Sequence, residues 1–189
     1  MLKKILEHNN RFLSERKKLG FCDKSISANA KQEVMIFTCM DTRLVELVEK
    51  SMGFERGDIK VLKNAGNCIR ENCDEIIRCI SLGAIMMGLK EVFVVGHKDC
   101  GMKKLTVEDI RAKMINRGIT EEAINSIDNL AEWSGILKDE TENVIKTVSK
   151  IRESQFVPKD VKVHGLTIDP YSGELEVIIN GDEIDKLAK

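Results

Sequence analysis

The chain has 189 residues, of which 42% are hydrophobic and 32% are charged, enough for one domain with a full core. Its 30 basic and 31 acidic residues give a net charge of −1 and are spread along the chain, so no basic block points to nucleic acid or to a membrane surface. No apolar stretch approaches the roughly 20 residues that span a bilayer, and the charged N-terminus does not read as a secretory signal. We therefore expect a cytoplasmic protein.

The first half of the chain alternates predicted helices and strands. Residues 1–19 have the spacing of an amphipathic helix, and β-forming apolar runs at 33–39 and 58–64 predict buried strands. Residues 43–54 and 74–88 show helical spacing, and each stretch has a glycine at or near its end. The apolar stripe of the first helix consists of Leu2, Ile5, Leu6, Phe12 and Leu13.

The second half continues this order. Residues 91–97 predict a third strand, 103–155 look largely helical and rather polar, and 161–169 predict a fourth strand. The turn sequence DPYSG should return the chain as an antiparallel edge strand. Strands alternating with helices over short connections predict an α/β fold, here one domain over 1–189 with a mostly parallel central sheet, flanking helices and an antiparallel C-terminal edge strand.

Chemically active side chains follow two of the predicted strands. Cys39 closes the first strand, His97 closes the third, and Cys100 comes three residues later. In open α/β sheets, ligands bind beyond the carboxyl ends of the strands, where neighbouring connections diverge. If these strands are neighbours, the two thiolates and the imidazole can converge on one zinc ion, leaving a fourth position open as in catalytic sites.

Asp41 and Arg43 follow Cys39 at alternate positions. In extended backbone such residues face the same side, so we expect both to point towards the metal. The planar fork of arginine can bind a carboxylate through two parallel hydrogen bonds, which keeps the carboxylate ionised and fixed in direction. An aspartate held in this way can accept a hydrogen bond from a metal-bound water.

These motifs resemble those of the β-class carbonic anhydrases. The resemblance covers roughly residues 30–180 and includes C-x-D-x-R at 39–43, H-x-x-C inside VVGHKDCGM, the loop KNAGN at 63–67 and the C-terminal VHGLTIDPYSGELEV. The short chain and GHKDCGM are most similar to the branch first known from archaea. The resemblance implies one Zn²⁺ per chain, a homodimer or higher homo-oligomer, and residues 1–30 as a helical arm that contacts a partner subunit.

The same resemblance implies reversible hydration of carbon dioxide to bicarbonate and a proton, by attack of zinc-bound hydroxide oriented by Asp41 and Arg43. Because two thiolates cancel the formal charge of zinc, we expect its pull on water to be weaker and activity to favour alkaline pH. In family members the aspartate can also leave its arginine and bind the zinc, which would close the site. In the KNAGN loop, Gly66 permits close backbone approach, and Asn64 and its neighbours could serve the substrate or only shape the loop.

Three alternatives remain open from the sequence. Similar proteins hydrolyse carbon disulfide or carbonyl sulfide with the same polar residues, and a non-catalytic zinc-binding or redox module could hold the same ligands. A structural zinc site could be closed by a fourth cysteine. Ordinary packing is the default for the remaining cysteines and histidines, which are Cys22, Cys68, Cys73, Cys79, His8 and His164.

Overall fold

A five-stranded sheet forms the centre of the protein. The computed structural model describes residues 1–18, 26–71 and 75–183. The strands are β1 (Val34–Cys39), β2 (Ile59–Asn64), β3 (Glu91–His97), β4 (Lys162–Ile168) and β5 (Leu175–Ile179). Their order is β2-β1-β3-β4-β5, with every neighbouring pair parallel except the antiparallel pair β4 and β5. The predicted α/β fold, with its mostly parallel sheet and antiparallel edge strand, is confirmed.

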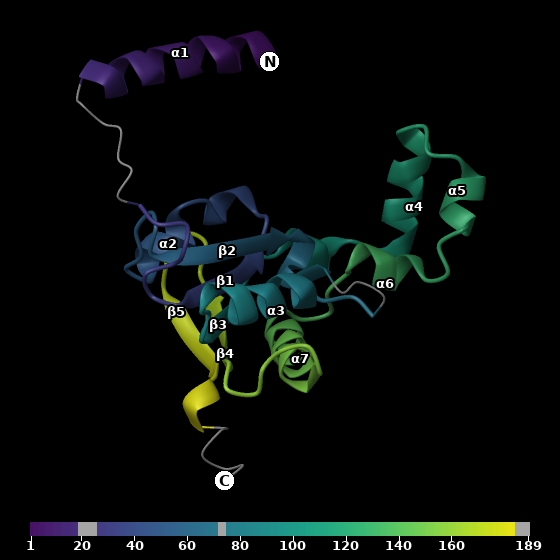
Figure 1. The fold of residues 1–189 in the computed structure, drawn as a ribbon. Helices are drawn as coiled ribbons and strands as arrows, with labels where there is room; N and C mark the ends of the chain where they lie inside the picture. Colours follow the sequence, from purple (N-terminus) through teal and green to yellow (C-terminus); the bar gives the residue numbers. More distant parts are fainter. Residues whose placement is uncertain (19–25, 72–74, 184–189) are drawn as a thin grey trace.

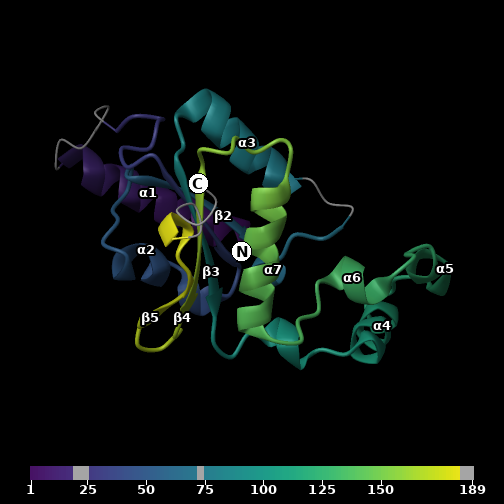
Figure 2. The same cartoon turned by 90° about the horizontal axis from the view of Figure 1, so that it is seen from below.

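Helices cover both faces of the sheet. The helices α3 (Glu75–Met87) and α7 (Glu140–Glu153) pack on one face, where Phe37 of β1 lies in their apolar cluster. The short α2 (Leu47–Ser51) and the preceding 3₁₀ turn η1 (Thr42–Leu44) pack on the other face, around Ile36. Figures 1 and 2 show α3 and α7 together on the side of the sheet opposite α2. Because both faces are covered, β1 is buried along its whole length.

The polar segment between β3 and β4 divides into several helices. After the 3₁₀ turn η3 (Gly101–Lys104) come α4 (Val107–Asn116), α5 (Glu121–Asn125) and α6 (Leu130–Ser134), and then α7. The N-termini of all four are capped by side chains, at Thr106, Thr120, Asn129 and Asp139. Figure 1 shows α4 and α5 extending away from the sheet. The predicted helical content of this segment is confirmed.

The N-terminal helix α1 (Leu2–Lys18) confirms the helix predicted at residues 1–19, apart from residue 19, which lies outside the described residues. None of the side chains described in α1 is buried, and Figure 1 shows this helix standing apart from the sheet. Within the described parts of the chain, no helix combines the length and the apolar character needed to cross a membrane.

The helix α7 packs directly against two strand residues that have no side chain. A Cβ added at Gly96 of β3 would lie 2.6 Å from Val144 Cγ2, and one added at Gly165 of β4 would lie 2.7 Å from Val144 Cγ1. Val144 is fully buried, and its branched side chain has little rotational freedom. The two glycines therefore set the distance of α7 from the strand that ends in His97.

We expect Gly96→Ala to destabilise the protein by about 1 to 3 kcal/mol, because the new methyl group overpacks against Val144. Urea unfolding at fixed metal loading measures this change. Gly101→Ala is the matched control, since a Cβ there meets nothing within 4 Å. Equal stabilities for wild type and Gly96→Ala would show that α7 can move away from the sheet at no cost.

Candidate metal centre

The carboxyl ends of β1 and β3 bring three metal-binding side chains together. The two strands are neighbours and run parallel, with Thr38 opposite Val95, so Cys39 and His97 end at the same edge of the sheet. The backbone turns back after His97, with Asp99 in the left-handed conformation (φ 57°), and this turn brings Cys100 to the same point. The ligand atoms of Cys39, His97 and Cys100 all lie within 4.8 Å of one another. All three residues are at least 96% buried.

The His97 ring is oriented as a metal ligand. Its Nδ1 lies 2.9 Å from the carbonyl oxygen of Lys98, and a hydrogen bond there requires a proton on Nδ1. The other ring nitrogen, Nε2, is buried and has no hydrogen-bond partner among the described residues. A buried nitrogen without a partner is costly unless a ligand satisfies it. The imidazole, beside two sulfur atoms, therefore fits a zinc ion.

The two thiols and the imidazole affect one another's protonation. The adjacent Cys100 side chain, together with His97, lowers the pKa of Cys39 to about 4 against the opposing effect of burial. The neighbouring Cys39 side chain and burial raise the pKa of Cys100. Burial lowers the pKa of His97, but the neighbouring Cys39 side chain outweighs this effect and raises the pKa overall. A divalent cation that bound here would displace protons from these groups.

Asp41 and Arg43 form a two-point ion pair at the edge of this cluster. Arg43 Nε donates to Asp41 Oδ1 at 3.0 Å, and Nη2 donates to Oδ2 at 2.8 Å. These bonds, together with one from the Arg43 backbone N–H, lower the pKa of Asp41 to about 2. Asp41 Oδ2 lies 3.9 Å from Nε2 of His97. An ionised, oriented carboxylate thus lies next to the three metal-binding atoms.

Asp41 and Arg43 do meet, but the reason expected from the sequence, alternation along an extended strand, was wrong. Asp41 and Arg43 do not continue the extended backbone of β1, which ends at Cys39. Asp41 is instead the N-cap of the 3₁₀ turn η1, and its carboxylate accepts the Arg43 backbone N–H at 2.9 Å. A capping turn, rather than strand alternation, therefore sets the geometry of the pair.

The KNAGN loop contacts the cluster through one backbone group. Gly66, in the left-handed conformation (φ 74°), donates its N–H to Cys39 Sγ at 3.4 Å. A hydrogen bond to sulfur stabilises the thiolate form. The Asn64 side chain closes its own loop through two hydrogen bonds with the Cys68 backbone, at 2.8 and 3.2 Å. A part for Gly66 or Asn64 in substrate binding stays a prediction.

The remaining described cysteines and histidines lie outside the cluster. Cys68 and Cys79 are half-buried free thiols, and neither belongs to the group of metal-binding atoms. Cys22 and Cys73 lie outside the described residues. His8 is exposed on α1, and His164 stacks on Phe93 within the sheet at a ring distance of 4.6 Å. Among the described residues, no fourth cysteine closes the site.

Several residues around the cluster were not identified from the sequence. Arg43 also binds Asp99 and Tyr171, and Glu140 of α7 accepts the backbone N–H of Cys100 at 3.4 Å. Glu140 also pairs with Lys103 at 2.6 Å, which connects the turn after Cys100 to α7. Asp99 lies inside the HKDC motif and could have been suspected. Tyr171 lies inside the matched stretch VHGLTIDPYSGELEV but far along the chain from Arg43, and Glu140 lies in none of the motifs, so folding alone brings them to the site.

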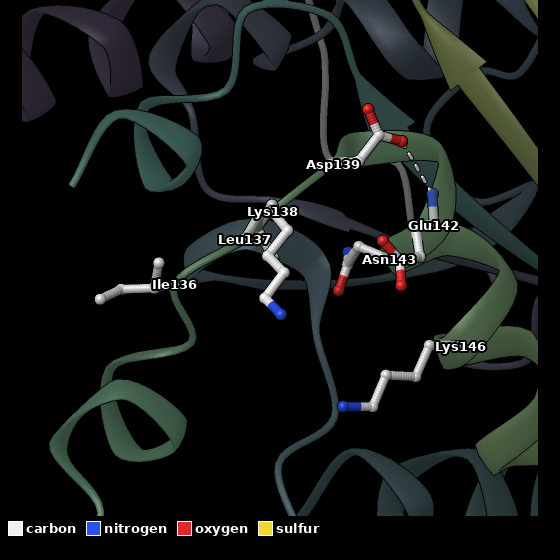
Figure 3. A pocket seen from close by; sticks show the side chains of 7 residues that line it. All are labelled: Ile136, Leu137, Lys138, Asp139, Glu142, Asn143 and Lys146. Carbon is white, nitrogen blue, oxygen red and sulfur yellow. Dashed lines mark hydrogen bonds between the residues drawn. The ribbon is translucent and has the colours of Figure 1, made fainter. Parts of the chain in front are cut away.

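A polar pocket lies close by but is separate from the metal centre. It has a volume of about 220 Å³ and is formed by the chain that leads into α7 and by the first turns of that helix. Figure 3 shows the side chains that line it, including the Asp139 carboxylate that caps the helix at Glu142 N (3.0 Å). Its lining residues are Ile136, Leu137, Lys138, Asp139, Glu142, Asn143 and Lys146, and the metal-binding residues are not among them.

Comparison with known proteins agrees with this geometry. The sequence profile of the carbonic anhydrase family matches residues 34–175. "Putative carbonic anhydrase YvdA" of Bacillus subtilis is 37% identical over 188 residues (97% of this chain and 94% of that protein), and a carbon disulfide hydrolase of Acidianus is 31% identical over 150 residues (71% of each). The crystal structure of a β-carbonic anhydrase from Trichomonas vaginalis superposes with a TM-score of 0.88 at 32% identity, covering 96% of this chain and 98% of that one. The chain belongs to the β-class carbonic anhydrase family.

Proposed function

We propose that the protein catalyses the reversible hydration of carbon dioxide to bicarbonate and a proton at one zinc ion held by Cys39, His97 and Cys100. The observation that carries this proposal is the oriented Asp41 carboxylate, 3.9 Å from His97 Nε2, beside three converging ligand atoms. A closed structural site needs no such group. The short chain with its GHKDCGM motif supports placement in the archaeal-type branch, as part of the same proposal.

When bound, zinc supplies a Lewis acid that makes water a nucleophile near neutral pH. The residues of this chain provide the rest. Asp41 would accept a hydrogen bond from the attacking water and so direct the lone pair of that water outward, while Arg43 keeps Asp41 ionised and fixed. The Lys98 carbonyl orients His97, and the Gly66 N–H withdraws electron density from the Cys39 sulfur. The buried ligands exclude bulk water from the inner side of the site.

A stopped-flow indicator assay tests the proposed function. The zinc-loaded protein should acidify a weakly buffered solution of carbon dioxide faster than the same protein stripped by a chelator, and zinc should restore the rate. Equal rates for the zinc-loaded and stripped proteins would refute the proposal.

Hydrolysis of carbon disulfide is the second candidate, and the Acidianus relative is the observation that favours it. The polar residues of the metal centre suit both reactions, because each begins with attack on a linear carbon centre. Sulfide release from carbon disulfide and carbonyl sulfide, measured beside carbon dioxide hydration on the same preparation, separates the two. We expect hydration to be much the faster reaction.

We also propose that the protein is a homodimer in which residues 1–30 form an arm that contacts the partner. The support is the apolar stripe of α1, which is exposed within the described residues although it is spaced for packing. An unpartnered helix of this kind gains stability from a second surface. The exposed stripe residues are Leu2, Ile5, Leu6, Phe12 and Leu13.

Substituting glutamine for Leu6 and Leu13 together should shift the protein towards the monomer, because the change removes two apolar contacts from the stripe. Light scattering coupled to size exclusion, over a range of protein concentrations, measures the mass. The matched control replaces Lys3 and Arg11, on the polar side of the same helix, by glutamine. If both double variants keep the wild-type mass, the arm does not hold the dimer together.

A further inference from the structure

The Arg43 guanidinium uses all of its hydrogen-bond donors. An arginine has five N–H donors in one plane, and five hydrogen bonds from Arg43 to described residues match them. Two go to Asp41. The other Nη2 hydrogen donates to the Asp99 backbone oxygen at 3.0 Å, and Nη1 donates to Asp99 Oδ2 at 3.0 Å and to the Tyr171 hydroxyl at 2.9 Å. Three of the five bonds therefore do not depend on Asp41.

Asp99 is well placed to hold this guanidinium. It lies between the metal-binding residues His97 and Cys100, in a left-handed conformation that aspartate tolerates better than most residues. Both its backbone oxygen and its carboxylate accept from Arg43, and the second carboxylate oxygen pairs with Lys104. The turn that positions two metal ligands thus also fixes Arg43.

Tyr171 also contacts the Arg43 guanidinium. It lies in the turn between β4 and β5, where the Asp169 carboxylate accepts the backbone N–H groups of Tyr171 and Ser172 at 2.8 and 3.0 Å. The tyrosine ring lies under the guanidinium, with its centroid 5.4 Å from Arg43 Cζ. Tyr171 is 76% exposed to solvent, and it contacts Arg43 through both its hydroxyl group and its ring.

We propose that Asp99 and Tyr171 are positioning residues that hold the Arg43 guanidinium in place independently of Asp41. Arg43 therefore keeps its position even when its two side-chain bonds to Asp41 are broken. Such exposed contacts add little to stability one by one, so their effect is on geometry. The fixed position of Arg43 is inferred from these contacts alone. Its effect on turnover rests on the proposed function.

Nuclear magnetic resonance of the arginine side chains tests the fixed position without any substrate. Restricted rotation should give Arg43 separate Nη signals in the wild type, and the Nη1 signals should persist in Asp41→Ala. The Nη1 signals should average in the double variant Tyr171→Phe with Asp99→Ala, which removes both side-chain acceptors of Nη1. Replacing Asp99 by asparagine instead of alanine keeps an acceptor oxygen and should restore the separate signals in part. If Asp41→Ala alone averages every Nη signal, the proposal is wrong.

Turnover tests the consequence. Zinc-loaded Tyr171→Phe with Asp99→Ala should lose about 10-fold to 100-fold in kcat for carbon dioxide hydration with little change in KM, because a displaced Arg43 no longer orients Asp41. Ser172→Ala, in the same turn and without a contact to Arg43, should retain the wild-type rate. A wild-type kcat in the double variant would overturn the proposal. A zinc-loaded wild type without hydration activity would refute only the proposed function, since the resonance experiment still decides how Arg43 is held.

Discussion

Replacing Cys39 by serine is expected to remove zinc binding and carbon dioxide hydration together. A serine hydroxyl stays protonated at neutral pH and is a poor zinc ligand, so two protein ligands would remain where three are needed. Metal analysis after dialysis should fall from about one zinc per chain to well below one, and the indicator assay should fall to the uncatalysed rate. Circular dichroism establishes that the variant is folded.

Cys79→Ser is the matched control for this experiment. Cys79 is a half-buried free thiol on α3 and lies outside the metal-binding group, so its loss should leave zinc content and turnover unchanged. A Cys39→Ser protein that kept its full zinc content would show that the ligand assignment is wrong. One that lost zinc but kept turnover would contradict metal-dependent catalysis.

Changing Asp41 to asparagine should lower turnover by about 100-fold or more while zinc stays bound. The amide has nearly the shape of the carboxylate, but it is neutral and replaces one acceptor oxygen by a donor NH2 group, so it accepts hydrogen bonds more weakly. Asp41 is not among the three ligand atoms, so its charge should matter for the reaction rather than for metal affinity. Metal content and kcat, measured on the same preparation, separate the two effects.

Arg43→Lys provides a graded version of the same test. Lysine keeps the positive charge but cannot make the two parallel bonds that Arg43 makes with Asp41, so we expect an intermediate loss in kcat. Lys50→Ala is the control, because it breaks an exposed ion pair with Glu46 on the neighbouring helix without touching the site. If Arg43→Lys were as active as the wild type, the positive charge at residue 43 would be sufficient, and the two parallel hydrogen bonds to Asp41 would not be needed for turnover.

The strands were the best predicted part of the fold, because runs rich in β-forming apolar residues mark them in the sequence. Residues 91–97 form β3 as predicted, and such runs suit a sheet covered on both faces. The stretch 43–54 was less well predicted. It shows helical spacing, but Glu46 adopts a left-handed conformation (φ 61°) that separates η1 from the short α2. A helical pattern does not reveal such a break, which depends on local packing.

The cluster of Cys39, His97 and Cys100 could be predicted because each of the two strand ends carries its own short motif. The sequence left open whether the two strands are neighbours. The sheet order β2-β1-β3-β4-β5 places β1 beside β3 and so brings Cys39 and His97 to one edge. The surrounding contacts could not be predicted. Tyr171 lies 128 positions from Arg43 and Glu140 lies 40 from Cys100, so only the packing of the β4–β5 turn and of α7 brings them to the site.

X-ray absorption at the zinc edge tests the central claim most directly, because it counts the ligand atoms of each kind. Purified zinc-loaded protein should show two sulfur ligands at about 2.3 Å and lighter nitrogen or oxygen ligands at about 2.0 Å. The Cys79→Ser protein should give the same spectrum, and Cys100→Ser should lose a sulfur ligand. A site with three or four sulfur ligands in the wild type would contradict the account, since no position would then remain open for the reaction.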